Sequence, residues 1–74
     1  MLKVIWVNST LRAKEGAIRG VLIAAGWTEE SNWNFSPGAG TITEPDHIID
    51  RISAGTDIHP LVTIDRNQIT VELR

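Results

Sequence analysis

The chain has 74 residues, with nine acidic and seven basic side chains, a formal net charge of −2 and no cysteine. This length fits one domain, residues 1–74, and so short a domain buries only about 60% of the surface that its unfolded chain exposes. Without cysteines, neither disulfides nor a thiolate metal site can stabilise it. Good core packing and self-association remain as means of stabilising the fold. The three tryptophans and an apolar first strand favour a homo-oligomer.

Charge and hydropathy narrow the classes of partner. The densest basic group is Arg12, Lys14 and Arg19, and Glu15 lies among them. Nucleic-acid-binding proteins usually carry a basic face, so a nucleic-acid partner is disfavoured. No apolar run approaches the roughly 18 residues of a membrane span, and the short apolar start followed by Asn8-Ser9-Thr10 does not resemble a secretory signal. We therefore expect a cytoplasmic protein with no membrane partner.

The first third of the chain predicts a strand and a helix. Leu2 to Val7 is apolar at both alternating sets of positions, which predicts a strand inside a sheet and covered on both faces. Leu11 to Ala25 follows with helical periodicity, and Gly26 is suited to end that helix. Gly16 and Gly20 share one face of it. They either allow another backbone to approach closely or are simply tolerated, and we favour tolerance.

The middle of the chain predicts a hairpin and a second helix. Asn32 to Phe35 and Thr41 to Thr43 alternate like short strands, and Ser36 to Gly40 between them has the composition of a turn. The next helix is expected to begin with Thr43 as its cap and Pro45 in its first turn, and to end at Gly55.

The last part of the chain predicts a second hairpin. Apolar and polar residues alternate from Val62 to Asp65 and again from Ile69 to Arg74, and Arg66-Asn67 forms the turn, with Asn67 suited to positive φ. The predicted fold class is therefore α+β: a small antiparallel or mixed sheet with two helices on one face, in the order β-α-(β-β)-α-β-β.

Few residues have the chemistry of a catalytic or metal site. His47 and Asp50 share a helix face, and a metal site would need a third ligand from Asp57 or His59. We favour a solvated His47 instead, and expect no metal and no cofactor. Gly38 to Thr41 lacks the context of a phosphate loop, because Pro37 precedes it and a strand-like segment follows it.

The aromatic side chains are the other candidates for binding. Core packing is the expectation for Trp6. Trp33 and Phe35 lie in a polar, turn-rich segment, so we expect them to be exposed and available to a ligand or partner.

One segment resembles a known family. His59-Pro60, the alternating strand after it, the turn ending in Asn67 and the strand to Leu73 resemble the core of the pterin-4a-carbinolamine dehydratases. That family carries a His-His-Pro motif, an alternating strand, a Tyr-Asn turn and a second alternating strand. Ala25-Gly26-Trp27 also resembles the Gly-Trp that follows the family's first helix.

The resemblance implies an α+β fold that assembles into dimers and tetramers and dehydrates a 4a-hydroxytetrahydropterin through histidines, without metal. It implies a catalytic role for His59, with Asp57, Pro60 and Asn67 as candidate binding residues. The sequence departs from the family at Ile58, where the first histidine of the pair is expected, and at Arg66, which replaces the turn tyrosine. The family's later Thr-Thr-His motif has no counterpart in residues 1–74.

Two functional hypotheses follow. The leading one is a non-enzymatic binding or interaction module, expected to be oligomeric, that acts on a protein partner or on itself through its sheet or its aromatic side chains. The alternative is a shortened dehydratase-like lyase that binds a pterin or similar heterocycle near His59, where a histidine could serve as acid or base.

Overall fold

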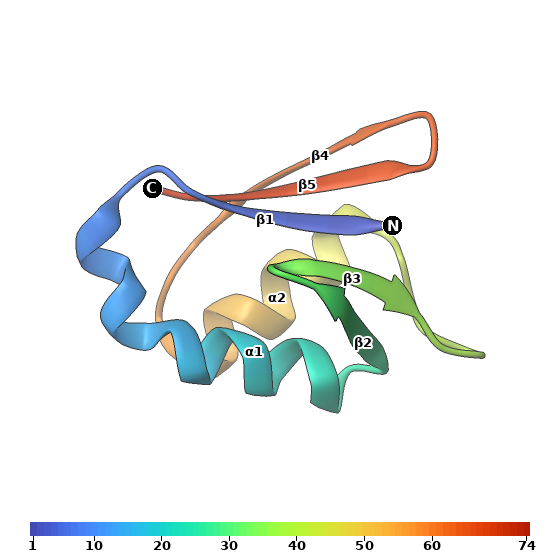
Figure 1. Ribbon diagram of the computed structural model, residues 1–74, viewed down its shortest axis with the longest axis horizontal. Helices are drawn as coiled ribbons and strands as arrows, with labels where there is room; N and C mark the ends of the chain where they lie inside the picture. The colour runs from blue at the N-terminus through green and yellow to red at the C-terminus, as the bar shows by residue number, and fades with distance from the viewer.

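The computed structural model describes residues 1–74 as five strands, two α-helices and one 3₁₀ helix (Figure 1). The elements in chain order are β1 (Leu2–Trp6), the 3₁₀ helix η1 (Ser9–Lys14), α1 (Glu15–Ala24), β2 (Trp27–Ser31), β3 (Asn34–Pro37), α2 (Pro45–Thr56), β4 (Leu61–Asp65) and β5 (Gln68–Leu73). This is the predicted order of strands and helices.

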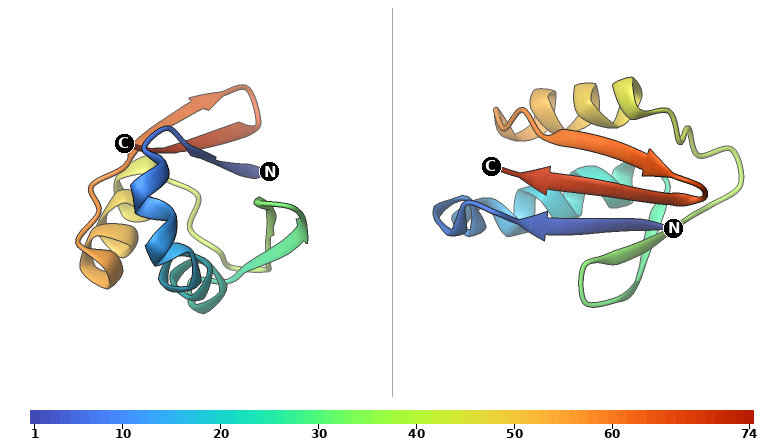
Figure 2. Two further views of the ribbon diagram at one scale, coloured as in Figure 1. Left: turned by 60° about the vertical axis from the view of Figure 1, so that its left-hand side comes forward. Right: turned by 90° about the horizontal axis from the view of Figure 1, so that it is seen from above.

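The strands form one mixed sheet in the order β2-β3-β1-β5-β4. β1 is parallel to β5 and antiparallel to β3, and the two hairpins β2–β3 and β4–β5 are antiparallel. Both helices lie on the same face of the sheet (Figure 2). The predicted α+β class, with a small mixed sheet and helices on one face, is confirmed.

β1 lies inside the sheet as predicted, between β3 and β5, but only one of its faces is covered. Leu2 and Val4 are buried against the helices, whereas Lys3 and Ile5 are exposed on the opposite face, Ile5 by 37%. The prediction of a strand covered on both faces was wrong, because both helices pack on one side.

The first predicted helix divides into two parts. The 3₁₀ helix η1 begins after Asn8, whose side-chain oxygen accepts the backbone N–H of Thr10 at 3.1 Å, and the α-helix proper starts at Glu15. Gly26, with φ of 107°, follows the end of α1 in the conformation expected of a helix-ending glycine. No atom outside the helix's own backbone lies within 4 Å of a Cβ placed at Gly16 or Gly20, so their toleration is confirmed.

α2 begins with Pro45 in its first turn as predicted, although Glu44 rather than Thr43 is the capping residue. The prediction that Gly55 ends the helix was wrong. α2 continues to Thr56, and Asp57 ends it with φ of 61°. Gly55 serves another purpose, because a Cβ at this position would collide with the Val21 side chain of α1. The close crossing of the two helices therefore depends on this glycine.

The β2–β3 hairpin turns at Asn32-Trp33, not at the Ser36 to Gly40 segment where the composition predicted it. Trp33 adopts φ of 58°, an uncommon conformation for a non-glycine residue. Its N–H is donated to a Glu29 carboxylate oxygen at 3.0 Å, and its carbonyl accepts the Val4 N–H at 3.0 Å. The nearby Glu29 carboxylate and the distant Val4 N–H thus hold the turn together, and local composition does not reveal the second contact.

The β4–β5 hairpin has the predicted two-residue loop, Arg66-Asn67, with Asp65 paired to Gln68. Positive φ falls on Arg66, at 59°, rather than on Asn67 as predicted. Positive φ at the first loop residue is characteristic of type II′ hairpin turns.

A single cluster of fourteen buried hydrophobic residues lies between the sheet and the helices. Its members are Leu2, Val4, Ile18, Leu22, Trp27, Trp33, Phe35, Ile48, Ile52, Ile58, Val62, Ile69, Val71 and Leu73. Neither helix is long and apolar enough to cross a membrane.

Candidate functional site

The residues near the family-like histidine lie in the loop between α2 and β4. Asp57 is exposed and ends α2, His59 is exposed, and Pro60 is buried at the start of β4. The His59 Nδ1 atom lies 3.3 Å from the Ser53 hydroxyl of α2. None of the three cavities of the molecule is lined by His59.

Asn67 is separated from this loop by the whole length of β4. A strand rises about 3.3 Å per residue, so the five residues of β4 place the two groups about 16 Å apart along the strand. The structure therefore does not bring Asn67 together with Asp57, His59 and Pro60.

Trp33 and Phe35 are buried, with exposed fractions of 4% and 0%, so the expectation that they are exposed was wrong. The Trp33 ring packs edge-to-face on Trp6 with centroids 5.1 Å apart, and its centroid lies 6.0 Å from that of Phe35. Trp6 is partly buried against the core as expected. These aromatic side chains pack the end of the sheet rather than present a binding surface.

An ion pair supports this aromatic cluster. The Arg19 Nε atom donates to Glu29 at 2.6 Å, and the guanidinium carbon of Arg19 lies 4.3 Å from the Trp33 ring centroid. Glu29 thus receives hydrogen bonds from Arg19 and from the Trp33 backbone, and both lower the pKa of its carboxyl group below the ordinary value. The same hydrogen bond raises the pKa of Arg19. The pair fixes the β2–β3 turn against α1.

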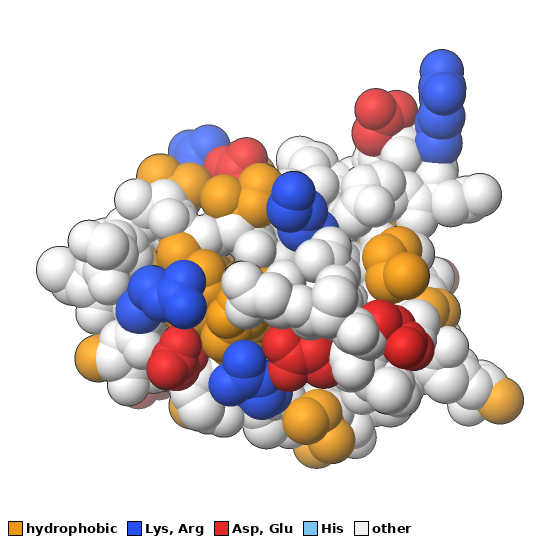
Figure 3. All heavy atoms as spheres, in the orientation of Figure 1, with side chains coloured by type: hydrophobic (Ala, Val, Ile, Leu, Met, Phe, Trp, Pro, Cys, Tyr) orange, Lys and Arg blue, Asp and Glu red, His pale blue; other side chains and the backbone are white.

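His47 and Asp50, which the sequence offered as metal ligands, have no third ligand close by. His47 and Asp50 lie on α2, and no group of three or more His, Asp or Glu side chains gathers closely enough to hold a metal ion. On the face shown in Figure 3, Lys and Arg side chains lie beside Asp and Glu side chains rather than in a single basic patch.

The free edge of β4 is the first candidate site. Ile69 donates its backbone N–H to the Met1 carbonyl at 2.9 Å, toward β1, so it does not bond Ile64 across the hairpin. In an antiparallel pair, Ile64 must then direct its own N–H and C=O away from β5, and so must Val62 two residues before it. These groups face outward along the edge. Leu61 and Ile64 are 42% and 46% exposed on its two faces.

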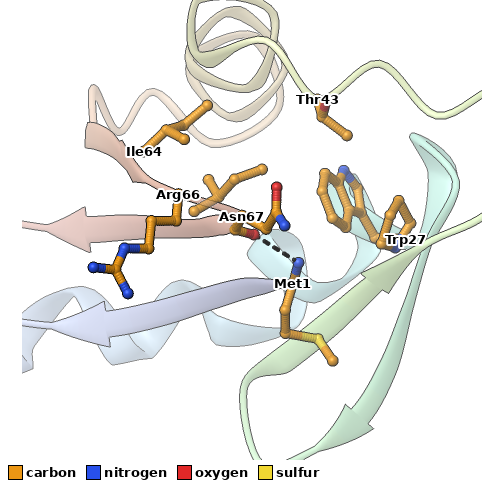
Figure 4. A pocket seen from close by; sticks show the side chains of 8 residues that line it. Met1, Trp27, Thr43, Ile64, Arg66 and Asn67 are labelled. Atoms are coloured by element: carbon orange, nitrogen blue, oxygen red, sulfur yellow. Dashed lines mark hydrogen bonds between the residues drawn. The ribbon is translucent and has the colours of Figure 1, made fainter.

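A cavity of about 310 Å³ near the β4–β5 turn is the second candidate site (Figure 4). In Figure 4 Trp27 and Ile64 lie on opposite sides of the cavity, with Thr43 above and Asn67 between them. Pro37 pairs with Trp27 and Ile69 with Ile64 across their hairpins, so each extends one of these two walls. Met1 and Arg66 complete the lining. The sequence suggested Asn67 through the family resemblance. The resemblance also pointed to Trp27, but no signal in the sequence placed Trp27 or Thr43 beside Asn67, and they come together only through the fold.

Comparisons with models of protein families, with curated proteins and with solved structures found no match to this chain. The resemblance to the dehydratases therefore stays a prediction from the residues that carry it.

Proposed function

We propose that this chain is a small interaction module that associates with a second copy of itself through the free edge of β4, and that it acts in the cytoplasm without catalysing a reaction. The observation that carries this proposal is the row of outward-facing backbone groups at Val62 and Ile64, flanked by the exposed side chains of Leu61 and Ile64. An unpaired strand edge is a template for pairing with another strand.

The sequence of β4 lacks the features that prevent such pairing. Leu-Val-Thr-Ile-Asp contains no lysine, no internal proline and no glycine, and its register with β5 shows no bulge. Edge strands that must stay unpaired usually carry such features. Pro60 lies just before the strand, where its missing N–H limits the pairing to the residues after it.

The strand is also complementary to itself. If two copies pair antiparallel about a two-fold axis at Thr63, Val62 of one copy lies opposite Ile64 of the other. Val62 and Ile64 direct their backbone N–H and C=O groups outward in both copies, so each of the two Val62–Ile64 pairs can form two hydrogen bonds. Thr63 faces Thr63, and Asp65 lies opposite Leu61, so no like charges are opposed. The two-fold axis uses the same surface of both copies, so the assembly stops at a dimer and does not extend into a fibre.

Apolar surface continues below the β4 edge onto α2. Ser53 of α2 contacts His59 just before β4, and Ile49 lies one helical turn earlier on that side. Ile49 is half-buried and packs against the core, and Ile64 points toward the same helix-covered face. Pairing of two β4 edges would cover both isoleucines, which adds a hydrophobic contribution to the backbone hydrogen bonds.

The test compares two substitutions at one position. Ile64→Pro removes the outward N–H but keeps a residue allowed at a strand edge, whereas Ile64→Ala keeps the N–H and removes only side-chain area. Sedimentation velocity from micromolar to millimolar concentration should show a dimer for the unmodified chain, weaker association for Ile64→Ala and a monomer for Ile64→Pro. Circular dichroism confirms that each variant is folded.

A second measurement needs no variant. Amide hydrogen exchange at Val62 and Ile64 should slow as the concentration of the unmodified chain rises, while the exchange of Lys3 on the open face should stay unchanged. A monomeric mass throughout, or a dimer that survives Ile64→Pro with unchanged affinity, contradicts the proposal.

The alternative hypothesis, a pterin-binding dehydratase-like protein, receives no support from a cavity at His59. It predicts that adding a reduced pterin shifts the ring signals of His59 and that His59→Ala abolishes these shifts. Neither result depends on the β4 edge, so the two hypotheses are tested separately.

A further inference from the structure

We infer that the cavity beside the β4–β5 turn is a binding site for a small, uncharged, planar ligand: an aromatic ring that carries an amide group. The inference rests on the shape and lining of this cavity and is independent of the self-association proposed for the β4 edge. Its volume of about 310 Å³ lies at the lower end of the range typical of ligand sites, which suits a single ring rather than a fused cofactor.

The walls of the cavity suit a flat apolar ring. Trp27 is 3% exposed and Ile69 is 5% exposed, so both are held firmly by the core. Pro37 lies directly opposite Trp27 in the β2–β3 pairing and extends this wall. Trp27 and Ile69 therefore present little area to a ring, and its apolar contacts would come mainly from the exposed side chains of Pro37 and Ile64. The buried residues fix the shape of the site, which lowers the cost of ordering it.

The side chains of Asn67 and Thr43 are uncharged hydrogen-bonding groups of the cavity and have no partner in the chain. The Asn67 side-chain amide lies between the two walls in Figure 4, and only the backbone carbonyl of Asn67 is engaged, by the Met1 amine at 3.1 Å. The nitrogen edge of the Trp27 indole faces Thr43 in the same view. The Trp27 indole N–H has no partner in the chain and is not among the fully buried unpartnered atoms, so it keeps some exposure at the cavity.

These groups select the chemistry of the ligand. An asparagine side chain offers one acceptor oxygen and two donor hydrogens, which match a primary amide in a reciprocal pair. The Trp27 N–H and the Thr43 hydroxyl can serve an acceptor at the far end of the same ligand. No carboxylate lines the cavity, the Arg66 guanidinium points away from its centre in Figure 4, and the Met1 ammonium is already bonded to the Asn67 backbone carbonyl. The hydrogen-bonding side chains left free are those of uncharged residues, which suit an uncharged ligand.

Benzamide is the probe that tests this inference, and toluene is the matched probe that keeps the ring and lacks the amide. In a ¹H–¹⁵N correlation titration, benzamide should produce saturable shifts of the Trp27 indole N–H and the Asn67 side-chain amide. The Trp6 and Trp33 indole signals, which belong to the opposite end of the sheet, should not move. Toluene should bind at least about fivefold more weakly, as expected for the loss of one net hydrogen bond.

Two substitutions locate the contact. Asn67→Ala should weaken benzamide binding about fivefold to tenfold without changing toluene binding. Thr43→Val, which preserves side-chain shape, should leave benzamide binding unchanged, because benzamide has no acceptor at the end away from its amide. The absence of saturable shifts up to the solubility limit of benzamide overturns the inference. Equal binding of benzamide and toluene, unaffected by Asn67→Ala, also overturns it, because the cavity would then be an apolar void without amide recognition.

Discussion

The two edges of the sheet are built in opposite ways. The β2 edge has two glutamates among its five residues, a register shift between Glu29 and Ser31, and a turn locked to the core by Trp33. The β4 edge has a regular register, β-branched residues and a single charge at its last position. Bulges and charges discourage strand addition, whereas a regular apolar edge permits it.

The difference shows how a small domain can separate stability from association. Trp33 and Phe35, which were expected to be exposed for binding, are buried at the β2–β3 end and complete the core. The apolar side chains left partly exposed, Leu61 and Ile64, lie at the other edge, beside backbone groups with free hydrogen-bonding capacity. Substitutions at the two edges should therefore affect different measurements.

The largest effect on stability is expected from Trp33→Ala at the β2–β3 end. The substitution removes a side chain that is 4% exposed and packed on Trp6 and Phe35, and such large-to-small changes cost about 3–5 kcal/mol. Urea unfolding measured at low temperature should show this loss, and Trp33→Phe should lose less. A loss below about 1 kcal/mol would mean that the aromatic cluster is not part of the core.

A smaller and pH-dependent effect is expected from Glu29→Gln. The pKa of Glu29 is lowered in the folded state by the hydrogen bonds from Arg19 and from the Trp33 backbone. Its contribution is therefore complete above the ordinary glutamate value of 4.5 and is lost as the pH falls through the lower folded value. The variant should have a lower urea midpoint than the unmodified chain at neutral pH, and the two midpoints should converge in acid.

Glu30→Gln is the matched control for that experiment. Glu30 is the next residue of β2, is exposed and bonds only the Ser36 hydroxyl. Glu30→Gln removes one negative charge from the same strand without breaking the Arg19 contact. It should therefore lower the urea midpoint less than Glu29→Gln does, and without the same convergence in acid. Identical pH profiles for the two variants would show that the Arg19 contact adds nothing specific.

The smallest effect on stability is expected from Leu61→Thr at the β4 edge. Leu61 is 42% exposed, and a β-branched residue suits a strand, so the free energy of unfolding of the dilute monomer should change by less than about 0.5 kcal/mol. Self-association, measured by sedimentation, should nevertheless weaken. A large loss of stability in the monomer would mean that Leu61 belongs to the core and not to an association surface.

The order of the elements and the class of fold could be predicted from the sequence because they depend on local patterns. Alternation from Val62 to Asp65 and from Ile69 onward identified the last hairpin, and the periodicity after Thr10 identified α1. The first hairpin was misplaced because Trp33 in its turn is bonded by Val4 of β1 and by Glu29, whose carboxylate is held in turn by Arg19 of α1. Tertiary contacts here override the turn-forming composition of Ser36 to Gly40.

Less of the candidate sites could be predicted. Asn67 was selected on a resemblance and does line a cavity, but its neighbours Trp27 and Thr43 come from segments far away in the sequence. The same resemblance pointed to His59, whose surroundings contain only the Ser53 hydroxyl as a side-chain partner. The β4 edge could not be identified, because the order of strands in a sheet is not contained in the pattern of any one strand.

The position of β1 has a consequence for how the chain folds. Its pairing partners include residues more than sixty positions away, as in the register of Leu2 with Ile69 and Val4 with Val71. Closing so long a loop is entropically costly, and folds with many distant pairings form slowly. Until β5 pairs with it, β1 exposes apolar side chains and one row of unpaired backbone groups. We therefore expect folding intermediates of this chain to aggregate more readily than the native protein, and chaperones to improve its yield.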